Sequence, residues 1–193
     1  LYGDGAHMGF DPRTARDAGC ILVWGANPSH SAPHMHKHWL RDTPARVVVI
    51  DPVCTRTAAE ADLHLQPRPG TDAALAFSLL HALREQGFFD EAFINQHTVG
   101  ADEIAPLIER CTPQWGEEHT GVPAADISQA ARLYGAGPAM LWVGQGLQRQ
   151  PQGGNVMRSA GLLPALTGNI GKRGTGFCYL NYTPFLIGAD ADY

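Results

Sequence analysis

Two runs of sequence decide the fold: Ile21-Leu22-Val23-Trp24-Gly25-Ala26-Asn27-Pro28 and, further along, Arg46-Val47-Val48-Val49-Ile50-Asp51-Pro52. Each is a short apolar run that stops at turn-forming residues, which is typical of a strand buried on both faces. Between them, Pro33 suits the first turn of a helix, and Thr43-Pro44 ends that helix after about Arg41. A strand, a helix and a second strand within about 30 residues form a βαβ unit, so the two strands are predicted to be parallel.

The same alternation continues outward from this unit. Residues 63–65 and 139–143 are predicted to be further short strands, and helices are predicted at about 73–86, 90–93, 102–110, 124–134 and 154–167. The pattern indicates an α/β fold, Rossmann-like and doubly wound, with a mostly parallel sheet and flanking helices. We expect a single domain over residues 1–193, an internal piece of a longer chain, with loop-like ends at 1–19 and 177–193.

Composition narrows the function. The chain is 44% apolar, enough for a packed core, and its net charge of −5 comes with scattered basic residues. A nucleic-acid footprint needs a basic patch, so no nucleic acid is expected as a partner. No apolar stretch reaches the roughly 20 residues that cross a bilayer. The four cysteines form no CxxC pair and are interpreted as buried free thiols, which leaves the choice between cytoplasm and periplasm open.

Polar residues follow the strands where each one ends: Asn27 and Pro28 after the first, Asp51 after the second, Gln145 and Gly146 after the last. Ligands of doubly wound sheets bind at this carboxyl edge. Gly25 would let a ligand approach the backbone, and Asn27 offers both donors and acceptors. Asp51 is placed like the carboxylate that binds ribose hydroxyls, and Asp72 suits the N1–H and N2–H edge of guanine.

These residues are also ordinary turn formers, so geometry alone leaves nucleotide binding and plain βα turns as alternatives. The first turn lacks GxGxxG, which disfavours a standard NAD site, and no GxxxxGK[ST] phosphate loop is present.

An ordered set of motifs resembles the molybdopterin oxidoreductases of the dimethyl sulfoxide reductase type. The motifs span nearly the whole chain: Trp24-Gly25-Ala26-Asn27-Pro28, Ile50-Asp51-Pro52-Val53-Cys54-Thr55-Arg56-Thr57-Ala58, Ala61-Asp62, Arg68-Pro69-Gly70-Thr71-Asp72-Ala73-Ala74-Leu75, Phe93-Ile94, Thr98-Val99-Gly100, Gly121-Val122-Pro123, Gly144-Gln145-Gly146-Leu147-Gln148, Leu166-Thr167-Gly168-Asn169-Ile170-Gly171 and Gly174-Thr175-Gly176. Each motif alone is weak, whereas the ordered set at these spacings is highly specific.

The resemblance implies that two molybdopterin guanine dinucleotides share one molybdenum or tungsten, and that two Rossmann-like domains hold their nucleotide tails. It implies that this chain is one of the two domains. It implies cofactor contacts in the turn Trp24–Ser31, with Asn27 foremost. It places Asp51 and Thr55 on the ribose or phosphate side, and Gly70, Thr71 and Asp72 at the guanine. Gln145, Gly146 and Arg149 would face the pterin and the metal.

The chain also departs from the family pattern. Val53 stands where many members have arginine, no cysteine motif for an iron–sulfur cluster is present, and no metal-ligand segment matches. No catalytic residue is therefore expected here, and the isolated piece is expected to be inactive. The resemblance implies the remaining domains of a parent oxidoreductase as partners, with an iron–sulfur electron-transfer subunit as a further candidate.

The alternative function is a stand-alone module without catalysis, which binds a guanine nucleotide or a divalent metal. His30, His34 and His38 recur every four residues, and Asp42 continues the row. On a regular helix such residues share one face, and paired histidines at that spacing can bind zinc. A solvated polar face explains the same pattern without a metal.

Overall fold

A computed structural model describes residues 12–179, and in this part of the chain the strands form one parallel five-stranded sheet. The spatial order is β3-β2-β1-β4-β5. The strands are β1 (Cys20–Trp24), β2 (Arg46–Ile50), β3 (Leu63–Leu65), β4 (Ala139–Val143) and β5 (Gly176–Tyr179). The order runs outward in both directions from β1, so the chain reverses direction between β1 and β4, which is the topological switch point.

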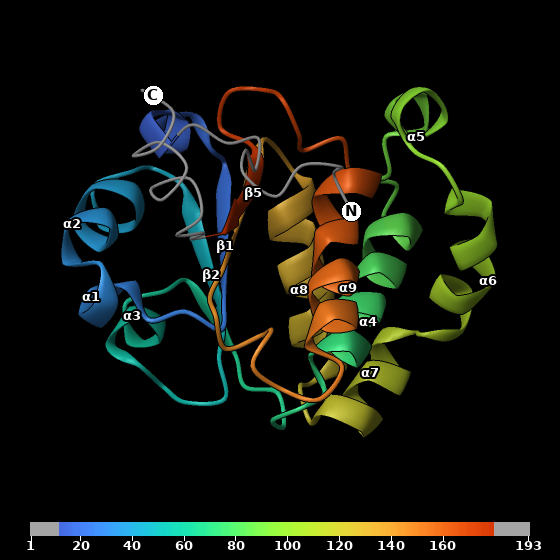
Figure 1. Cartoon of the computed structure of the whole chain (residues 1–193), viewed down its shortest axis with the longest axis horizontal. Helices are drawn as coiled ribbons and strands as arrows, with labels where there is room; N and C mark the ends of the chain where they lie inside the picture. Colours follow the sequence, from blue (N-terminus) through green and yellow to red (C-terminus); the bar gives the residue numbers. More distant parts are fainter. Residues whose placement is uncertain (1–11, 180–193) are drawn as a thin grey trace, which may run out of the picture.

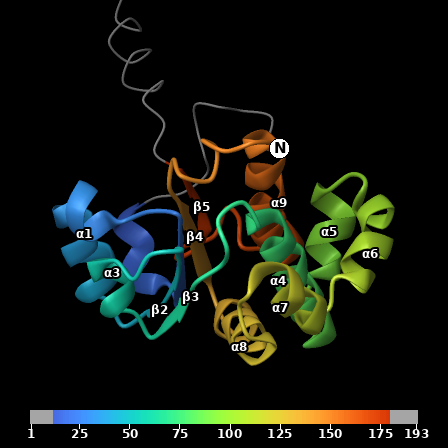
Figure 2. The same cartoon turned by 90° about the horizontal axis from the view of Figure 1, so that it is seen from below.

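Helices cover both faces of the sheet, as the doubly wound fold requires (Figures 1 and 2). One face carries η1 (Pro12–Asp17), α1 (Pro28–Ser31), α2 (Pro33–Met35), the π-helix η2 (His36–Arg41) and α3 (Arg56–Ala59). The other carries the thicker layer: α4 (Asp72–Glu85), α5 (Glu91–His97), α6 (Ala101–Arg110), α7 (Pro113–Thr120), α8 (Ala124–Gly135) and α9 (Gly153–Leu166).

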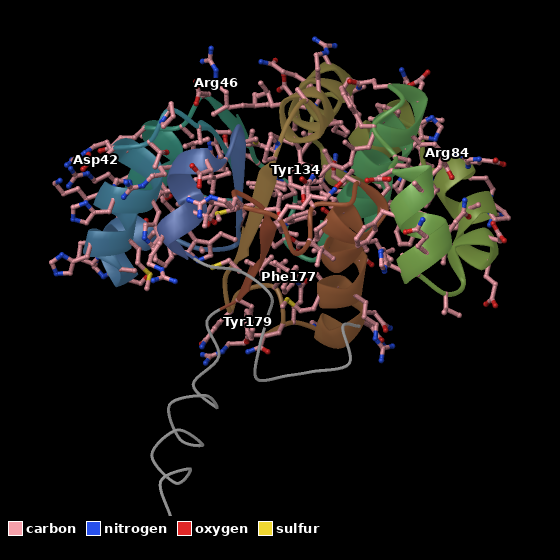
Figure 3. The ribbon with its side chains drawn as sticks, turned by 90° about the horizontal axis from the view of Figure 1, so that it is seen from above. Asp42, Arg46, Arg84, Tyr134, Phe177 and Tyr179 are labelled. Atoms are coloured by element: carbon pink, nitrogen blue, oxygen red, sulfur yellow. The ribbon has the colours of Figure 1, made fainter. Side chains whose placement is uncertain are left out.

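Successive side chains of each strand point to opposite faces of the sheet. Leu22 and Trp24 pack into the cluster with α4, α8 and α9, while Ile21 and Val23 pack into the cluster under η1, η2 and α3. Every residue of β1 and β4 is buried, because both strands lie in the middle of the sheet with helices above and below. In Figure 3, Asp42 and Arg84 lie on opposite outer sides of the molecule, with Tyr134 between them.

Three expectations about the elements need correction. The helix predicted up to Arg41 is broken: α1 ends at Ser31, α2 starts at Pro33, and the remainder is π-helix. Residues 177–179 belong to β5 instead of a loop, and residues 12–17 form η1. The helix α7 was not predicted. Residues 18 and 19 connect η1 to β1, and the rest of the expected loop-like ends, residues 1–11 and 180–193, lies outside the described part.

The cysteines differ from one another. Cys20, Cys111 and Cys178 are buried free thiols, as predicted, whereas Cys54 is exposed, so that interpretation is wrong for it. Burial raises the pKa of the Cys20 thiol to about 12 and also raises the pKa of Cys178. Along the described residues, no helix combines the length and the apolar character that a membrane span needs.

Asp62, directly before β3, is hydrogen-bonded to two residues of β2. Its carboxylate accepts the buried amide of Val47 at 2.8 Å and the Arg46 guanidinium at 2.6 Å. Partial burial raises the pKa of Asp62, but the bonds from Val47 and Arg46 outweigh it and hold this pKa below its usual value. A depressed pKa in the folded state means that the ionised carboxylate stabilises the fold above the unfolded pKa of about 4, and that this stability is lost as the pH falls below it.

We therefore expect Asp62→Ala to lower the free energy of unfolding at pH 7 by about 1–3 kcal/mol, because the Val47 amide loses its acceptor. Asp62→Asn keeps an acceptor and should lose less, about 1 kcal/mol. Urea unfolding at pH 7 and pH 3 measures both, and the gap between wild type and the Asn variant should shrink at pH 3. If the difference in unfolding free energy between wild type and Asp62→Asn is the same at pH 3 and pH 7, the loss does not come from the charge of the carboxylate.

Candidate functional site at the carboxyl edge of the sheet

Three strands end level with one another at the carboxyl edge. The register pairs Trp24 of β1 with Ile50 of β2 and with Val143 of β4. Gly25, Asp51 and Gly144 are the residues that follow these three positions, so the turns predicted to carry the ligand start at the same height. The edge includes the switch point between β1 and β4.

The glycines of these turns pack against each other. Gly25 has a φ of +60°, and the side chain of Leu147 lies where a Cβ of Gly25 would be. Leu147 therefore accounts for the need for glycine at this position, and the approach of a ligand to Gly25 stays a prediction. A Cβ on Gly144 would lie 2.6 Å from the Gly25 carbonyl carbon. Small residues are needed here because two backbone turns cross in contact.

Asn27 is held by its own turn and by α3. Its side-chain oxygen accepts hydrogen bonds from Ser29 Oγ at 2.7 Å and from Thr57 Oγ1 at 3.0 Å. The same Thr57 oxygen accepts from the Ser29 amide at 3.0 Å. The acceptor half of Asn27 is thus used within the chain, and its amide N–H groups are the part that a ligand would meet.

The turn after β2 brings Asp51 and Thr55 to the same edge. Asp51 Oδ1 accepts the Val53 amide at 2.8 Å, and the Asp51 carbonyl oxygen lies 2.9 Å from His64 Nε2. Thr55 caps α3, where its hydroxyl accepts the Ala58 amide. Asp51 is half-buried, and Val53 is 63% exposed.

Asp72 joins the start of α4 to the end of β1. Its Oδ1 accepts the indole N–H of Trp24 at 2.8 Å, and its Oδ2 accepts Gln150 Nε2 at 3.0 Å. Trp24 is only 1% exposed, so its side chain contacts Asp72 from within the core. Thr71 bonds the Arg68 carbonyl oxygen, and Gly70 before it is exposed.

The remaining predicted residues lie in the flanking turns. In the loop after β4, Arg149 Nη2 donates to Gln145 Oε1 at 2.8 Å; Arg149 and Gly146 are exposed. In the turn after β1, Pro28 is buried, and the exposed Ser31 donates its hydroxyl to the Asn27 carbonyl oxygen at 3.0 Å. The two turns lie on adjacent strands, β4 and β1.

Two residues of this edge were missed by sequence reasoning. Thr57 lies inside one of the matched motifs, so its place beside the Asn27 turn was open to inference. Gln150 had no such signal, because its bond to Asp72 joins residues 78 positions apart.

The histidine row does not assemble. The break after Ser31 and the π-helix interrupt the regular row of His30, His34 and His38, while Asp42 pairs with Lys37 at 2.6 Å and with His38 Nδ1 at 3.6 Å. His30, His34 and His38 are all exposed. Over residues 12–179, no three His, Cys, Asp or Glu side chains are gathered to hold a metal ion.

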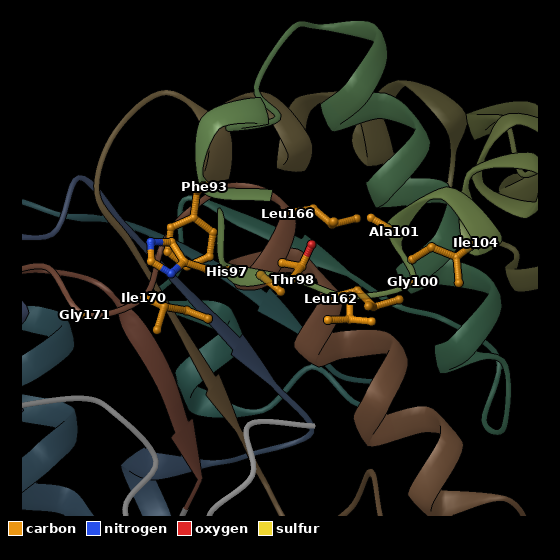
Figure 4. A pocket seen from close by; sticks show the side chains of 12 residues that line it. Phe93, His97, Thr98, Gly100, Ala101, Ile104, Leu162, Leu166, Ile170 and Gly171 are labelled. Carbon is orange, nitrogen blue, oxygen red and sulfur yellow. The ribbon is translucent and has the colours of Figure 1, made fainter. Parts of the chain in front are cut away.

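A cavity of about 710 Å³ lies away from this edge, between α5, α6 and the end of α9 (Figure 4). Phe93, His97, Ile104, Leu162 and Leu166 are among its mostly apolar lining residues. It lies beside the loop that leads into β5, and therefore toward the amino edge of the parallel sheet. It does not include any of the predicted site residues.

The family model and the similar proteins of known name agree on one family. Residues 13–190 match the model of the molybdopterin oxidoreductase family. The chain is 36% identical over 160 residues to formate dehydrogenase H of Escherichia coli, covering 81% of this chain and 22% of that protein. It is also 36% identical over 157 residues to the assimilatory nitrate reductase of Haloferax mediterranei, covering 80% of this chain and 22% of the relative.

Among solved structures, acetylene hydratase from Pelobacter acetylenicus has the same fold, with a TM-score of 0.74 at 24% identity. The match covers 86% of this chain and 24% of that chain. The chain thus spans about a quarter of the length of its relatives. The family match over nearly its whole length leads to one conclusion: this chain belongs to the molybdopterin oxidoreductase family, whose cofactor is a molybdenum or tungsten pterin.

Proposed function

We propose that this chain holds the guanine-nucleotide end of a molybdopterin guanine dinucleotide within a molybdenum or tungsten oxidoreductase. One observation carries the proposal: the turns that hold Asn27 and Asp51 follow the carboxyl ends of β1 and β2, and Asp72 accepts a hydrogen bond from Trp24, the last residue of β1, beside the switch point between β1 and β4. Open parallel sheets bind nucleotides at this position.

The chemistry of the three side chains suits the parts of a nucleotide. Asp72 is an acceptor-only carboxylate, which matches a base edge that presents two N–H groups, as guanine does. Asp51 can accept from ribose hydroxyls, and the N–H groups of Asn27 can donate to ribose or phosphate oxygens. In this arrangement Gly70 and Thr71 lie beside the base, Thr55 beside the sugar, and Pro28 and Ser31 in the turn that meets the tail.

The loop after β4 faces the other half of the cofactor in this proposal. Gln145, Gly146 and Arg149 would contact the pterin, with the Arg149–Gln145 bond orienting the guanidinium. When bound, the pterin-held metal supplies the redox chemistry, while this chain supplies binding and orientation. The remaining domains of the parent enzyme would supply the metal ligand, and a separate iron–sulfur subunit would carry electrons, so the isolated chain should not turn over.

The test uses the 193-residue chain and GDP, which stands in for the guanine, ribose and diphosphate of the cofactor. We expect calorimetry to give GDP an affinity at least about tenfold above that of ADP, because adenine offers Asp72 one donor and one acceptor. Zinc, titrated in parallel, tests the alternative module. Binding of zinc with no preference for GDP over ADP would favour that alternative and reject the proposal.

The reactivity of Cys54 can report where the nucleotide binds. It is exposed in the turn between Asp51 and Thr55, whereas Cys20, Cys111 and Cys178 are buried. A thiol reagent at pH 8 should therefore modify one cysteine quickly, and saturating GDP should slow this reaction several-fold. ADP at the same concentration is the control. If GDP binds but leaves the rate at Cys54 unchanged, the nucleotide lies elsewhere.

A further inference from the structure

The Asp72 carboxylate is clasped from two sides by residues distant in sequence. The indole N–H of Trp24 donates to Oδ1 at 2.8 Å across 48 positions, and Gln150 Nε2 donates to Oδ2 at 3.0 Å across 78 positions. Gln150 is itself held by a second bond from Nε2 to the Leu147 carbonyl oxygen at 3.1 Å. We call Trp24, Asp72 and Gln150 the Asp72 clasp.

The two donors fix the orientation of the Asp72 carboxylate but leave it able to accept further hydrogen bonds. The indole is locked, because Trp24 is the last residue of the central strand β1 and is packed in the main core. One donor on each oxygen fixes the plane of the group, since rotation about the Cβ–Cγ bond would break both bonds. Each oxygen keeps a further lone-pair site, so the clasped carboxylate can still accept two parallel N–H bonds.

We propose that Trp24 and Gln150 are positioning residues that orient Asp72 to accept both N–H donors of one base edge, and thereby set the preference of this site for guanine. The inference rests on the proposed function of Asp72 as the base acceptor. Pre-orientation matters because a freely rotating carboxylate loses side-chain entropy when it makes two bonds at once, whereas a single bond demands less alignment. The clasp should therefore favour guanine over hypoxanthine, which lacks the 2-amino group.

A double-mutant cycle between protein and ligand tests this. GDP and IDP differ only in the 2-amino group. Gln150→Leu removes one donor with little change of volume, and Trp24→Phe removes the other and leaves a smaller ring in the core. In the wild-type chain we expect GDP to bind about tenfold more tightly than IDP. In either variant that ratio should fall to about threefold or less, with most of the loss in GDP affinity.

Gln148→Leu is the matched control, because Gln148 lies exposed in the same loop and is not part of the clasp. It should leave the GDP to IDP ratio unchanged. Gln150→Glu provides a second variant of native shape that places a second carboxylate beside Asp72. It should lower GDP affinity more than Gln150→Leu does, since like charges repel.

A readout without ligand tests the hydrogen bond between Trp24 and Asp72 directly. The indole N–H resonance of Trp24, assigned by its loss in Trp24→Phe, should move upfield in Asp72→Asn as the charged acceptor disappears. If the wild-type chain binds GDP no better than ADP, the proposed function fails and the inference falls with it. If GDP is preferred but both variants keep the wild-type GDP to IDP ratio, the function stands and the positioning role is overturned.

Discussion

Replacing Gly144 by alanine is expected to destabilise the chain by about 3 kcal/mol, near the upper end of what overpacking costs. A Cβ at this position would lie 2.6 Å from the Gly25 carbonyl carbon and 2.8 Å from the Ala26 Cα, which is closer than real Cβ atoms come to other atoms. These neighbours are backbone atoms of the adjacent strand's turn, so no side chain can rotate away. The Gly144 amide is also bonded to the Trp24 carbonyl oxygen at 2.7 Å, which holds the two turns together.

Guanidinium unfolding of purified chain measures this loss. Gly154→Ala is the matched control, because a Cβ there meets nothing within 4 Å and the residue lies in α9. That variant should be neutral or more stable by up to about 1 kcal/mol, as expected for alanine in a helix. Equal midpoints for wild type and Gly144→Ala would mean that the turns after β1 and β4 are not in the contact described.

The second large effect is expected from Asp72→Asn on nucleotide affinity. An asparagine can turn its oxygen toward Trp24 or toward Gln150, but its N–H₂ group then faces the other donor. It can no longer accept two N–H bonds from a base as well. The loss of charge-assisted hydrogen bonds should lower the affinity for GDP by about 3 kcal/mol, or about 100-fold, and leave ADP nearly unaffected.

Calorimetry with both nucleotides on wild type and variant checks this prediction. Asp102→Asn serves as the control, since Asp102 is exposed in the first turn of α6, in the outer helical layer (Figure 1). It removes the same charge away from the carboxyl edge and should leave both affinities unchanged. A uniform loss of GDP and ADP binding in Asp72→Asn would point to damage of the fold, and an unchanged GDP affinity would remove Asp72 from the site.

Local patterns predicted most of the elements because the signals are short-range. The predicted strands β1 to β4 were found, since an apolar run between turn residues has few other ways to bury both faces. The helix α7 was missed although Thr112 and Pro113 stand at its start and Gly121 at its end, which are ordinary boundary signals. The helix after the first strand was predicted as continuous because spacing alone does not reveal a π-helical turn.

The sequence by itself determined the parallel α/β fold, the turns that carry the candidate site, and the family, because each depends on residues close together in the chain or on motifs in order. Only the tertiary structure decided which atoms meet: that Trp24 and Gln150 hold Asp72, that Leu147 lies against Gly25, and that Asn27 uses its oxygen within the chain. These contacts join segments distant in sequence, which meet because the order of the strands in the sheet places their carboxyl ends at one edge.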